Sequence, residues 1–326
     1  MKYIFATFIL IIFLLTMSIH QGSNAVSVQD MQSSKFGIIH NLPVDGMEER
    51  SMDEVLSISA EILPIQFFPR QETIPEPEIE ASVALIQDLE TGQILYEANS
   101  YDRYQLASIT KLLTAVTIMD EYQWGTNEWI PMTESAANTY GSNAFLVGES
   151  FTIEDLIRGL LLPSNNIAAT RLAEHFGEGN PELFMEKMNQ KAQLLDMNQS
   201  KFVNPHGLDQ DGQYSTAADI MKLLDYVYSE YPEFWEIMRQ DQVVAVSQSG
   251  REVVLRNSNQ LVGDLPNLQG GKTGFTYDAL ETLASVIVVQ DRPIGIVVMQ
   301  SPIGGFRFSD TKKLSEWIEA SYELPL

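Results

Sequence analysis

The amino-acid sequence predicts an α+β fold, in which helices pack against an antiparallel sheet. Two strand-like runs joined by a turn lie within residues 82–100, and helical patterns dominate from residue 108 to about residue 231. Strand signals then return and are followed by a closing helix. This order of elements is typical of an antiparallel sheet with helices against it.

The composition is that of a globular protein, and it narrows the possible functions. The chain has 326 residues, 44% of them hydrophobic and 20% charged, which is enough to bury one large core or two modest ones. Its formal net charge is −24, so nucleic acid and anionic lipid are disfavoured as partners. There are no cysteines, and the four histidines lack paired ligand spacing, so we expect no metal site.

The N-terminus resembles an export signal. Residues 3–19 form an uncharged apolar run behind Lys2, and Ser23 and Ala25 are small residues at the positions that a signal peptidase reads. The run is also nearly long enough to span a bilayer. We therefore expect residues 1–25 to be a signal peptide or an N-terminal membrane anchor, with the rest of the chain outside the cytoplasm.

The next segment, residues 26–80, is predicted to be an acidic, proline-containing spacer. It has eleven acidic and three basic residues, five of the fourteen prolines and no sustained period. Closely spaced prolines near its end favour extended chain. The folded domain is therefore expected to span residues 81–326.

The elements of that domain are predicted in chain order. The run "SVALIQDLETGQILYEANS" at 82–100 is a hairpin signal with its turn at "LETG". Periodic apolar residues predict the helices that follow it. Those helices fall within residues 152–162, 165–176, 181–195 and 215–230. Strands are predicted within residues 242–257, 282–290 and 294–301, and a last helix over residues 311–322.

The stretch "LASITKLL" places Ser108 three residues before Lys111 at a predicted helix start. Residues at this spacing lie on one helix face with Cβ atoms about 5–6 Å apart, so the hydroxyl and the amine can meet. The spacing alone is not specific, because "SDTK" places Ser309 and Lys312 in the same way. An N-cap serine followed by a surface lysine would explain either pair.

Two further polar motifs follow the first Ser-Lys pair. "SNN" places Ser164 and Asn166 between two helical runs, and "KTG" begins at Lys272 and enters a strand-like segment. The ordered set S-x-x-K, S-x-N and K-T-G occurs in serine β-lactamases and penicillin-binding proteins. Nothing comparable follows Ser309, so the first pair is the candidate site.

Each motif supplies a group that acyl transfer needs. Lys111 can accept the Ser108 proton only when it is neutral, and an ordinary lysine has a pKa near about 10.4. Burial and the second cation, Lys272, would lower the pKa of Lys111. The Ser164 hydroxyl can relay a proton to the leaving group, and the Asn166 amide can hold Lys111 or a substrate carbonyl.

The backbone near these motifs can stabilise charge and bind an extended substrate. The N–H groups of Ser108 and Phe275 are candidates for an oxyanion hole, and a helix start at Ser108 favours developing negative charge. Gly274 would let a peptide pair with the edge of its strand without an intervening side chain.

Together these motifs resemble the serine D-alanyl-D-alanine carboxypeptidases, the low-molecular-mass penicillin-binding proteins of peptidase family S11. Residues 184–224, with "NPHGL" and "STAAD", are also similar to the stretch that follows S-x-N in that family. The likeness runs from about Ser82 to the C-terminal helix. It implies a β-lactamase/transpeptidase-like fold with a five-stranded antiparallel sheet, flanking helices and a helical subdomain, and it makes residues 81–326 the DD-peptidase catalytic domain.

The resemblance also implies roles for individual residues. It makes Ser108 the acylated nucleophile and Lys111 its general base, and it gives Ser164, Asn166 and Lys272 proton-relay and substrate-orienting roles. The residues implied in substrate binding are Lys272, Thr273, Gly274, Phe275, Thr276 and Arg307.

Some assignments stay open at this point. Arg307 is equally well explained as an exposed arginine near a helix start. His206 is expected to shape a turn rather than act as a base. The chain also departs from the family where many members carry an alanine-glycine pair, since "YDALETL" follows here, and Phe275 stands where a polar residue is often found. The rim of the site is therefore expected to differ.

The implied function is that of an exported D-Ala-D-Ala carboxypeptidase acting on peptidoglycan stem peptides through a serine acyl-enzyme. No cofactor is expected, and β-lactams are expected to be covalent inhibitors. A DD-endopeptidase acting on peptidoglycan cross-links and a catalytically idle wall-binding relative are the alternatives. A β-lactamase is disfavoured, because no "ExxLN" segment lies between "SNN" and "KTG". If the protein is tethered to a membrane, we expect residues 3–19 to do it.

Overall fold

The computed structural model of the chain describes residues 69–322. The chain divides into two compact units, Met1–Ile65 and Gln66–Leu326, and the described residues belong to the second. The predicted signal peptide or anchor and most of the predicted spacer lie outside the described residues. Within residues 69–322, no helix combines the length and the apolar character that crossing a bilayer requires.

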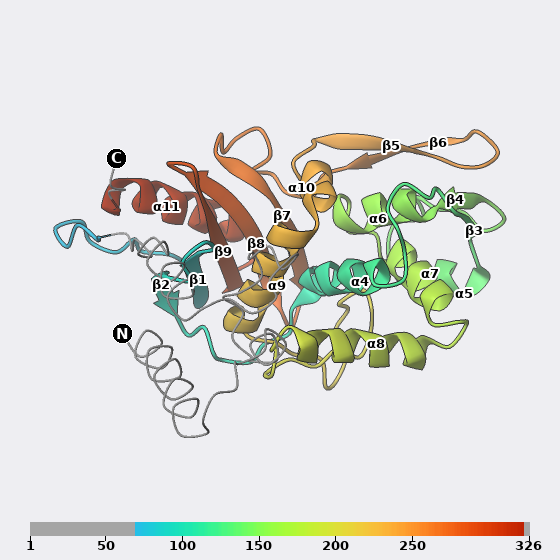
Figure 1. Cartoon of the computed structure of the whole chain (residues 1–326), viewed down its shortest axis with the longest axis horizontal. Helices are drawn as coiled ribbons and strands as arrows, with labels where there is room; N and C mark the ends of the chain where they lie inside the picture. The colour runs from blue at the N-terminus through green and yellow to red at the C-terminus, as the bar shows by residue number, and fades with distance from the viewer. Residues whose placement is uncertain (1–68, 323–326) are drawn as a thin grey trace, which may run out of the picture. The chain divides into compact units, whose positions relative to one another are not determined.

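A five-stranded antiparallel sheet is the frame of the described unit (Figure 1). The first hairpin lies beside the last strand, so the sheet joins the two ends of the folded sequence in the order β2-β1-β9-β8-β7. The strands are β1 (Val83–Asp88), β2 (Ile94–Ala98), β7 (Leu268–Thr276), β8 (Leu280–Val289) and β9 (Arg292–Ser301). The predicted α+β architecture is confirmed, and β7 forms one edge of the sheet.

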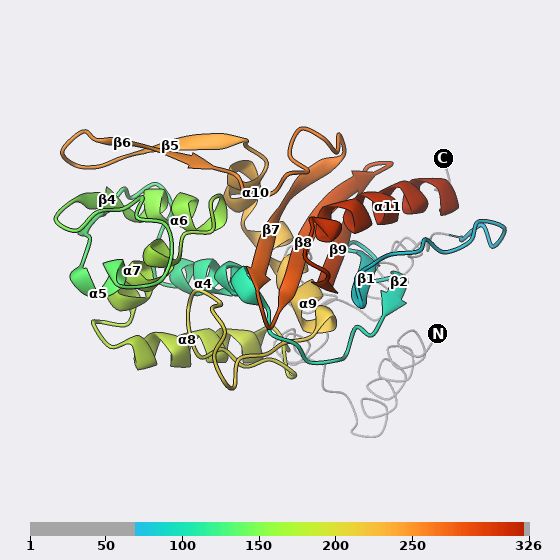
Figure 2. The ribbon, with the colours of Figure 1, turned by 180° about the vertical axis from the view of Figure 1, so that it is seen from behind.

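Both faces of this sheet are buried, because helices cover each of them. Successive side chains of a strand point to opposite faces. In β1, Val83 belongs to the core under helix α9 (Ala217–Glu230), and Ala84 belongs to the core under helix α11 (Phe306–Ser321). The two helices lie on opposite sides of the sheet (Figures 1 and 2).

The helical part of the unit packs around α4 (Thr110–Met119), in which nine of the ten residues are buried. Helices α6 (Ile153–Leu161), α7 (Asn166–Phe176) and α8 (Pro181–Leu194) contact it. Each of these three begins with a polar residue whose side chain accepts a backbone N–H of the first turn, as N-caps do. The helices predicted in this region are therefore confirmed, with ends that differ by one or two residues.

The smaller elements complete the helical side of the molecule. The strand signals at 242–257 form a separate hairpin beside α6 and not a part of the main sheet. No pattern predicted the short helix α10, and α11 begins five residues before the predicted helix. These elements are β3 (Trp129–Pro131), α5 (Glu134–Ala137), β4 (Ser150–Thr152), α10 (Pro232–Met238), β5 (Gln242–Val246) and β6 (Glu252–Arg256).

The described end of the predicted spacer contacts helix α11. The Arg70 guanidinium lies 5.3 Å from the ring centroid of Trp317. Asp310 Oδ2 accepts the backbone N–H groups of Glu80 and Ala81 at 3.1 and 2.9 Å. Residues of the spacer that precede the predicted boundary at residue 81 are therefore packed against the domain.

Candidate active site

Ser108 lies in a 3-10 turn, η1 (Ala107–Ile109), that leads directly into α4. Ala107 has a φ of 49°, a left-handed conformation that is uncommon for a residue other than glycine. No side chain caps the turn or the helix. The Ser108 hydroxyl instead lies 2.8 Å from Lys111 Nζ, so the spacing places these two groups in contact and an N-cap role does not apply.

Lys111 is fully buried, and its amine has three oxygen neighbours. Nζ lies 2.8 Å from Ser108 Oγ, 2.7 Å from Asn166 Oδ1 and 2.5 Å from the His206 carbonyl oxygen. Burial, and then the charge of Lys272, lower the pKa of Lys111 well below its ordinary value. A neutral amine has two N–H donors, enough for Asn166 and His206, and its lone pair remains for the Ser108 proton.

The S-x-N motif lies at the start of α7. Asn165 caps this helix by accepting the Ala168 N–H at 2.8 Å. Asn166 donates Nδ2–H to the Tyr140 carbonyl at 2.7 Å, which orients its Oδ1 toward Lys111. Ser164 has a φ of 61°, and its buried hydroxyl has no hydrogen-bond partner among the described residues. This unpaired hydroxyl lies two residues before Asn166, which contacts Lys111, and it keeps a donor for another group.

The K-T-G motif lies on the edge strand β7. Lys272 is fully buried, and its amine donates to the Thr273 carbonyl at 2.9 Å. Burial, and then the charge of Arg307, lower the pKa of Lys272 to about 7. A Cβ atom at Gly274 would lie 2.4 Å from Thr282 Oγ1 and 2.9 Å from the Ser108 nitrogen. Glycine therefore permits β7 to lie directly against the turn that contains Ser108.

The substrate-binding residues implied by the resemblance lie along β7 and at the start of α11. Arg307 is half-buried, and its Nη1 donates to the Gly274 carbonyl at 2.9 Å. The Thr273 hydroxyl lies 2.6 Å from Ser258 Oγ, and Thr276 Oγ1 accepts the Ala279 N–H at 3.0 Å. Arg307 thus faces the motif strand, and this location favours a role in the site over that of a solvent-exposed arginine.

The segment "NPHGL" contacts Lys111 and the turn of Ser108 through backbone groups, which could not be predicted from the sequence. The His206 carbonyl accepts from Lys111, and Gly207 has a φ of 83°. A Cβ atom at Gly207 would lie 1.9 Å from the Ala107 carbonyl oxygen. Burial, and then Lys111, lower the pKa of the His206 imidazole to about 3, and its Nδ1 accepts the Leu208 N–H at 3.2 Å. The neutral ring shapes the turn.

The second S-x-x-K does not form a comparable pair. The Ser309 hydroxyl donates to the Phe306 carbonyl at 3.1 Å, within its own helix. The Lys312 side chain is partly exposed, and its Nζ forms an ion pair with Asp264 at 3.4 Å. The two side chains therefore point to different partners, and the identical spacing carries no acyl-transfer site.

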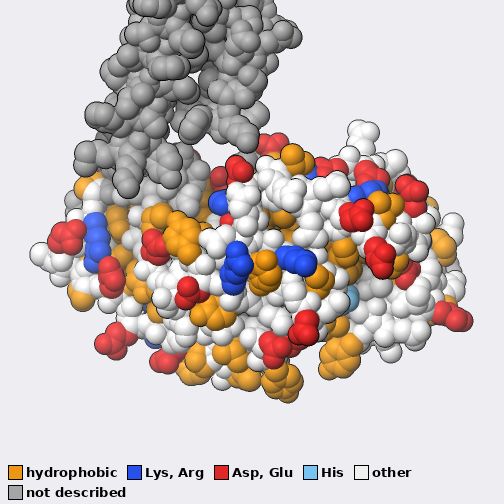
Figure 3. Space-filling view, turned by 90° about the horizontal axis from the view of Figure 1, so that it is seen from below, with side chains coloured by type: hydrophobic (Ala, Val, Ile, Leu, Met, Phe, Trp, Pro, Cys, Tyr) orange, Lys and Arg blue, Asp and Glu red, His pale blue; other side chains and the backbone are white. Residues whose placement is uncertain are grey.

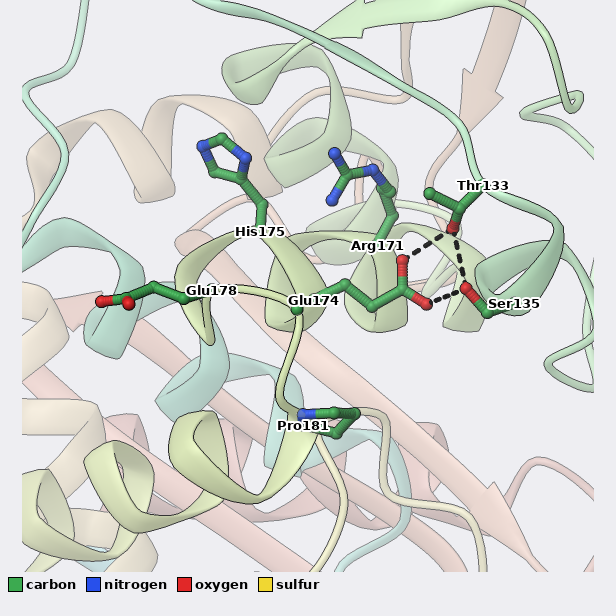
Figure 4. Close-up of a pocket in the computed structure, with 8 residues that line it drawn as sticks. Thr133, Ser135, Arg171, Glu174, His175, Glu178 and Pro181 are labelled. Atoms are coloured by element: carbon green, nitrogen blue, oxygen red, sulfur yellow. Dashed lines mark hydrogen bonds between the residues drawn. The ribbon is translucent and has the colours of Figure 1, made fainter.

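A separate cavity lies beside the C-terminal half of α7, and none of the motif residues lines it (Figure 4). Glu174 accepts hydrogen bonds from the hydroxyls of Thr133 and Ser135 at its edge. Arg171 and His175 also line it. Within residues 69–322, no group of three or more His, Asp and Glu side chains is arranged to hold a metal ion.

The charge of the site contrasts with that of the molecule. Acidic side chains are spread over the face shown in Figure 3, as the net charge of −24 leads one to expect. Lys272 and Arg307 instead place two basic groups beside the K-T-G strand. An anionic group of a substrate would therefore find its favourable electrostatic partners within the site.

A buried lysine that contacts a serine hydroxyl, with S-x-N and K-T-G groups on such a frame, defines a serine acyl-transfer site of the penicillin-binding type. A family model described as D-alanyl-D-alanine carboxypeptidase, peptidase family S11, matches residues 70–302. The chain belongs to this family.

Individual relatives agree with this assignment. The chain is 33% identical over 204 residues to D-alanyl-D-alanine carboxypeptidase DacF of Bacillus subtilis, a match that covers 61% of this chain and 52% of that protein. It is 31% identical over 264 residues to a D-alanyl-D-alanine endopeptidase of Escherichia coli, covering 78% of this chain and 82% of the relative. The chain thus spans about half the length of the first relative and most of the second.

Solved structures share the fold. A D-alanyl-D-alanine carboxypeptidase of Mycobacterium tuberculosis H37Rv superposes with a TM-score of 0.70 at 27% identity, covering 79% of this chain and 99% of that one. The Streptomyces K15 DD-transpeptidase has a TM-score of 0.71 at 23% identity, covering 76% of this chain and 100% of that one. The predicted β-lactamase/transpeptidase-like fold is confirmed.

Proposed function

We infer that the chain is a serine-type D-alanyl-D-alanine carboxypeptidase, a hydrolase that removes terminal D-alanine from peptidoglycan stem peptides. One observation supports this most directly: Lys111 is buried, its pKa is lowered, and its amine lies 2.8 Å from Ser108 Oγ. Membership of the family supplies the substrate class, and it makes β-lactams the expected covalent inhibitors.

In the proposed acylation, Ser108 Oγ attacks the carbonyl carbon of the D-Ala-D-Ala bond while its proton passes to Lys111 Nζ. The new C–O bond gives a tetrahedral oxyanion, which the N–H groups of Ser108 and Phe275 stabilise. The C–N bond then breaks, and the leaving amine of D-alanine receives the proton by way of the unpaired Ser164 hydroxyl.

Water completes the proposed cycle. It attacks the acyl-serine ester and loses a proton to Lys111, the ester C–O bond breaks, and the proton returns to Ser108. Asn166 keeps the Lys111 amine oriented through both half-reactions. The reaction needs no redox partner, because bonds are exchanged only between acyl carbon, oxygen and nitrogen.

The terminal carboxylate of the substrate is assigned to the basic end of the site. Arg307 and Lys272 supply charge near β7, and the hydroxyls of Thr273 and Thr276 lie along the same strand. Phe275 is 41% exposed and Tyr277 is 81% exposed, with ring centroids 5.7 Å apart, so this rim is aromatic. Because β7 is the edge strand of the sheet, an extended peptide can pair with it.

The protein is assigned to the cell envelope outside the cytoplasm, because its family acts on the cell wall. Export by residues 1–25 and a tether formed by residues 3–19 are proposals that rest on the sequence alone. Production of the full chain in bacteria, followed by N-terminal sequencing of the mature protein, tests both. A mature N-terminus near Val26 supports a cleaved signal peptide, and an intact N-terminus in the membrane fraction supports an anchor.

A second candidate function is that of a DD-endopeptidase. It is favoured by the relatives of E. coli and Pseudomonas aeruginosa with that name, of which the chain covers 82% and 85%. The bond that is cut would be the cross-link between two stem peptides, and the chemistry at Ser108 would be the same.

One experiment tests the function and separates the two candidates. Purified enzyme is incubated with a free pentapeptide that ends in D-Ala-D-Ala and, separately, with a cross-linked peptide dimer. The carboxypeptidase assignment predicts release of D-alanine from the pentapeptide at a higher kcat/KM than cleavage of the dimer. The opposite ratio supports the endopeptidase, and no reaction with either substrate in the presence of an intact Ser108 supports a catalytically idle wall-binding relative.

A further inference from the structure

Glu281 is a buried carboxylate that no motif accounts for. It lies at the start of β8, opposite Phe275 of β7 and Ser301 of β9, and it is only 6% exposed. A carboxylate buried to this extent requires hydrogen-bond donors or a cation nearby. Both are found at the start of helix α11.

The Glu281 carboxylate closes the N-terminus of α11. Its Oε1 accepts the backbone N–H groups of Gly304 and Gly305 at 3.1 and 2.9 Å. Its Oε2 lies 3.5 Å from the backbone nitrogen of Arg307. Gly305 is the N-cap residue of this helix and has no side chain with which to cap it. Glu281 therefore supplies, from a neighbouring strand, both the acceptor and the negative charge that a helix start favours.

Arg307 is the second residue of α11, so its location depends on where the helix starts. Its Nη1 donates to the Gly274 carbonyl at 2.9 Å, while its buried Nε–H has no partner among the described residues. The guanidinium group is thus held against the K-T-G strand and keeps a donor for a ligand.

The charges of the two side chains support each other. Burial lowers the pKa of Arg307, and the Glu281 carboxylate opposes that shift. Burial raises the pKa of Glu281, but the amides of Gly305 and Gly304 and the charge of Arg307 together lower it below its usual value. Both groups are therefore charged at neutral pH.

We propose that Glu281 is a positioning residue of the active site, which fixes the start of α11 and thereby holds Arg307 beside Gly274 to receive the terminal carboxylate of the substrate. The proposal rests on the proposed function, because that carboxylate belongs to a D-Ala-D-Ala peptide. Glu281 acts through Arg307 and does not contact the reacting atoms.

The test compares Glu281→Ala and Glu281→Gln with the unaltered enzyme on two peptides. One pentapeptide ends in a free D-alanine carboxylate, and the other ends in D-alanine carboxamide. Glu281→Ala is expected to raise KM for the free acid about tenfold, a factor that corresponds to about 1.4 kcal/mol. Its kcat stays within about twofold, and its kinetics on the carboxamide are unchanged, because only the carboxylate uses Arg307.

The glutamine variant and a surface variant serve as controls. A glutamine side chain keeps an acceptor oxygen of the same reach, so Glu281→Gln should retain KM within about threefold. Glu316 is an exposed carboxylate on the same helix, and Glu316→Ala should leave both peptides unaffected. Equal losses on both peptides, or an unchanged KM in Glu281→Ala, would overturn the proposal, since loosened folding lowers both activities alike.

A crystal structure of Glu281→Ala gives a second test that does not depend on activity. Arg307 Nη1 is expected to leave the Gly274 carbonyl, and a retained hydrogen bond contradicts the positioning role. If the unaltered enzyme releases no D-alanine while Arg307 moves in the variant, the proposed function fails and the structural part of the proposal stands.

Discussion

At the scale of single residues, Lys111 and Lys272 both have a pKa below that of an ordinary lysine, because both side chains are fully buried. Lys272 lowers the pKa of Lys111, and Arg307 lowers that of Lys272, in each case after burial. Each basic group thus disfavours a proton on the next one. The lowered pKa of Lys111 favours the neutral amine that it needs in order to accept the Ser108 proton.

The pKa of Lys272, about 7, predicts the alkaline limb of activity. Lys272 loses its proton as pH rises through about 7, and binding of a carboxylate weakens with it. The kcat/KM for D-alanine release, measured from pH 5 to 10, should therefore fall above about pH 7. In Lys272→Arg this limb should disappear, because arginine stays protonated.

The control for this profile is Lys201→Arg, since Lys201 is exposed and lies outside the site. It should keep the limb near pH 7. A limb that persists unchanged in Lys272→Arg would show that another group titrates there, and it would contradict the assigned role of Lys272.

Ser164 should matter for catalysis and not for stability. Its hydroxyl has no hydrogen-bond partner among the described residues, so Ser164→Ala breaks no bond of the folded state. We expect a free energy of unfolding within about 0.5 kcal/mol of the original. The loss of a proton relay should lower kcat about 100-fold or more.

Urea unfolding and steady-state D-alanine release measure these two effects. Asn165→Ala is the matched control, because it removes the cap of α7 and should lower stability by about 1 kcal/mol. If Ser164→Ala lost as much stability as Asn165→Ala and kept its kcat, Ser164 would be a structural residue.

At the scale of elements, local spacing could be predicted and distant backbone contacts could not. The contact between Ser108 and Lys111 follows from two residues three apart at a helix start. The His206 carbonyl is 95 residues from Lys111 in the sequence, and a backbone oxygen has no signature in the sequence. The contact of Glu281 with Gly305 likewise depends on how β8 meets α11. Both become apparent only in the folded chain.

The turn that holds Ser108 depends on Gly207. Gly207→Ala places a Cβ atom 1.9 Å from the Ala107 carbonyl oxygen, so η1 must shift. A displacement of about 1 Å at a reacting group can slow a reaction about 100-fold. We expect acylation by benzylpenicillin to slow by at least this factor, as measured by stopped-flow fluorescence or mass spectrometry.

Gly212→Ala is a control with the same backbone strain. Gly212 has a φ of 87°, close to the 83° of Gly207, and the nearest atom to its Cβ position is Val203 Cγ1 at 3.8 Å. This variant should lose about 1 kcal/mol of stability from the left-handed conformation and keep its acylation rate. Similar slow acylation in both variants would mean that the strain, and not the contact with η1, is responsible.

At the scale of the whole molecule, the order of strand and helix signals was enough to predict the α+β class. That order could not predict that β5 and β6 form a separate hairpin, because an alternating pattern predicts a strand but not the sheet to which the strand belongs. It also could not predict that residues before 81 contact α11, since Arg70 and Ile74 stand in a proline-rich, acidic segment. The extent of the folded domain therefore needs its own test.

We propose that residues 69–80 are also part of the folded domain. A chain of residues 82–326 lacks the Arg70 contact with Trp317 and the amide donors to Asp310, contacts that we expect to contribute about 2 kcal/mol together. Its melting temperature should be about 6 °C below that of residues 69–326, as measured by circular dichroism. Equal melting temperatures would place the boundary at residue 81.

The measurement that tests the account most directly is the intact mass of the purified chain after incubation with benzylpenicillin, beside the Ser108→Ala variant. We expect one persistent adduct on the unaltered protein and none on the variant, because Lys111, whose pKa is lowered, contacts and activates the Ser108 hydroxyl alone. An adduct on Ser108→Ala would contradict the assignment of the nucleophile. The absence of an adduct on either chain would contradict a persistent acyl-enzyme, and loss of penicillin from the same tube would then identify a β-lactamase.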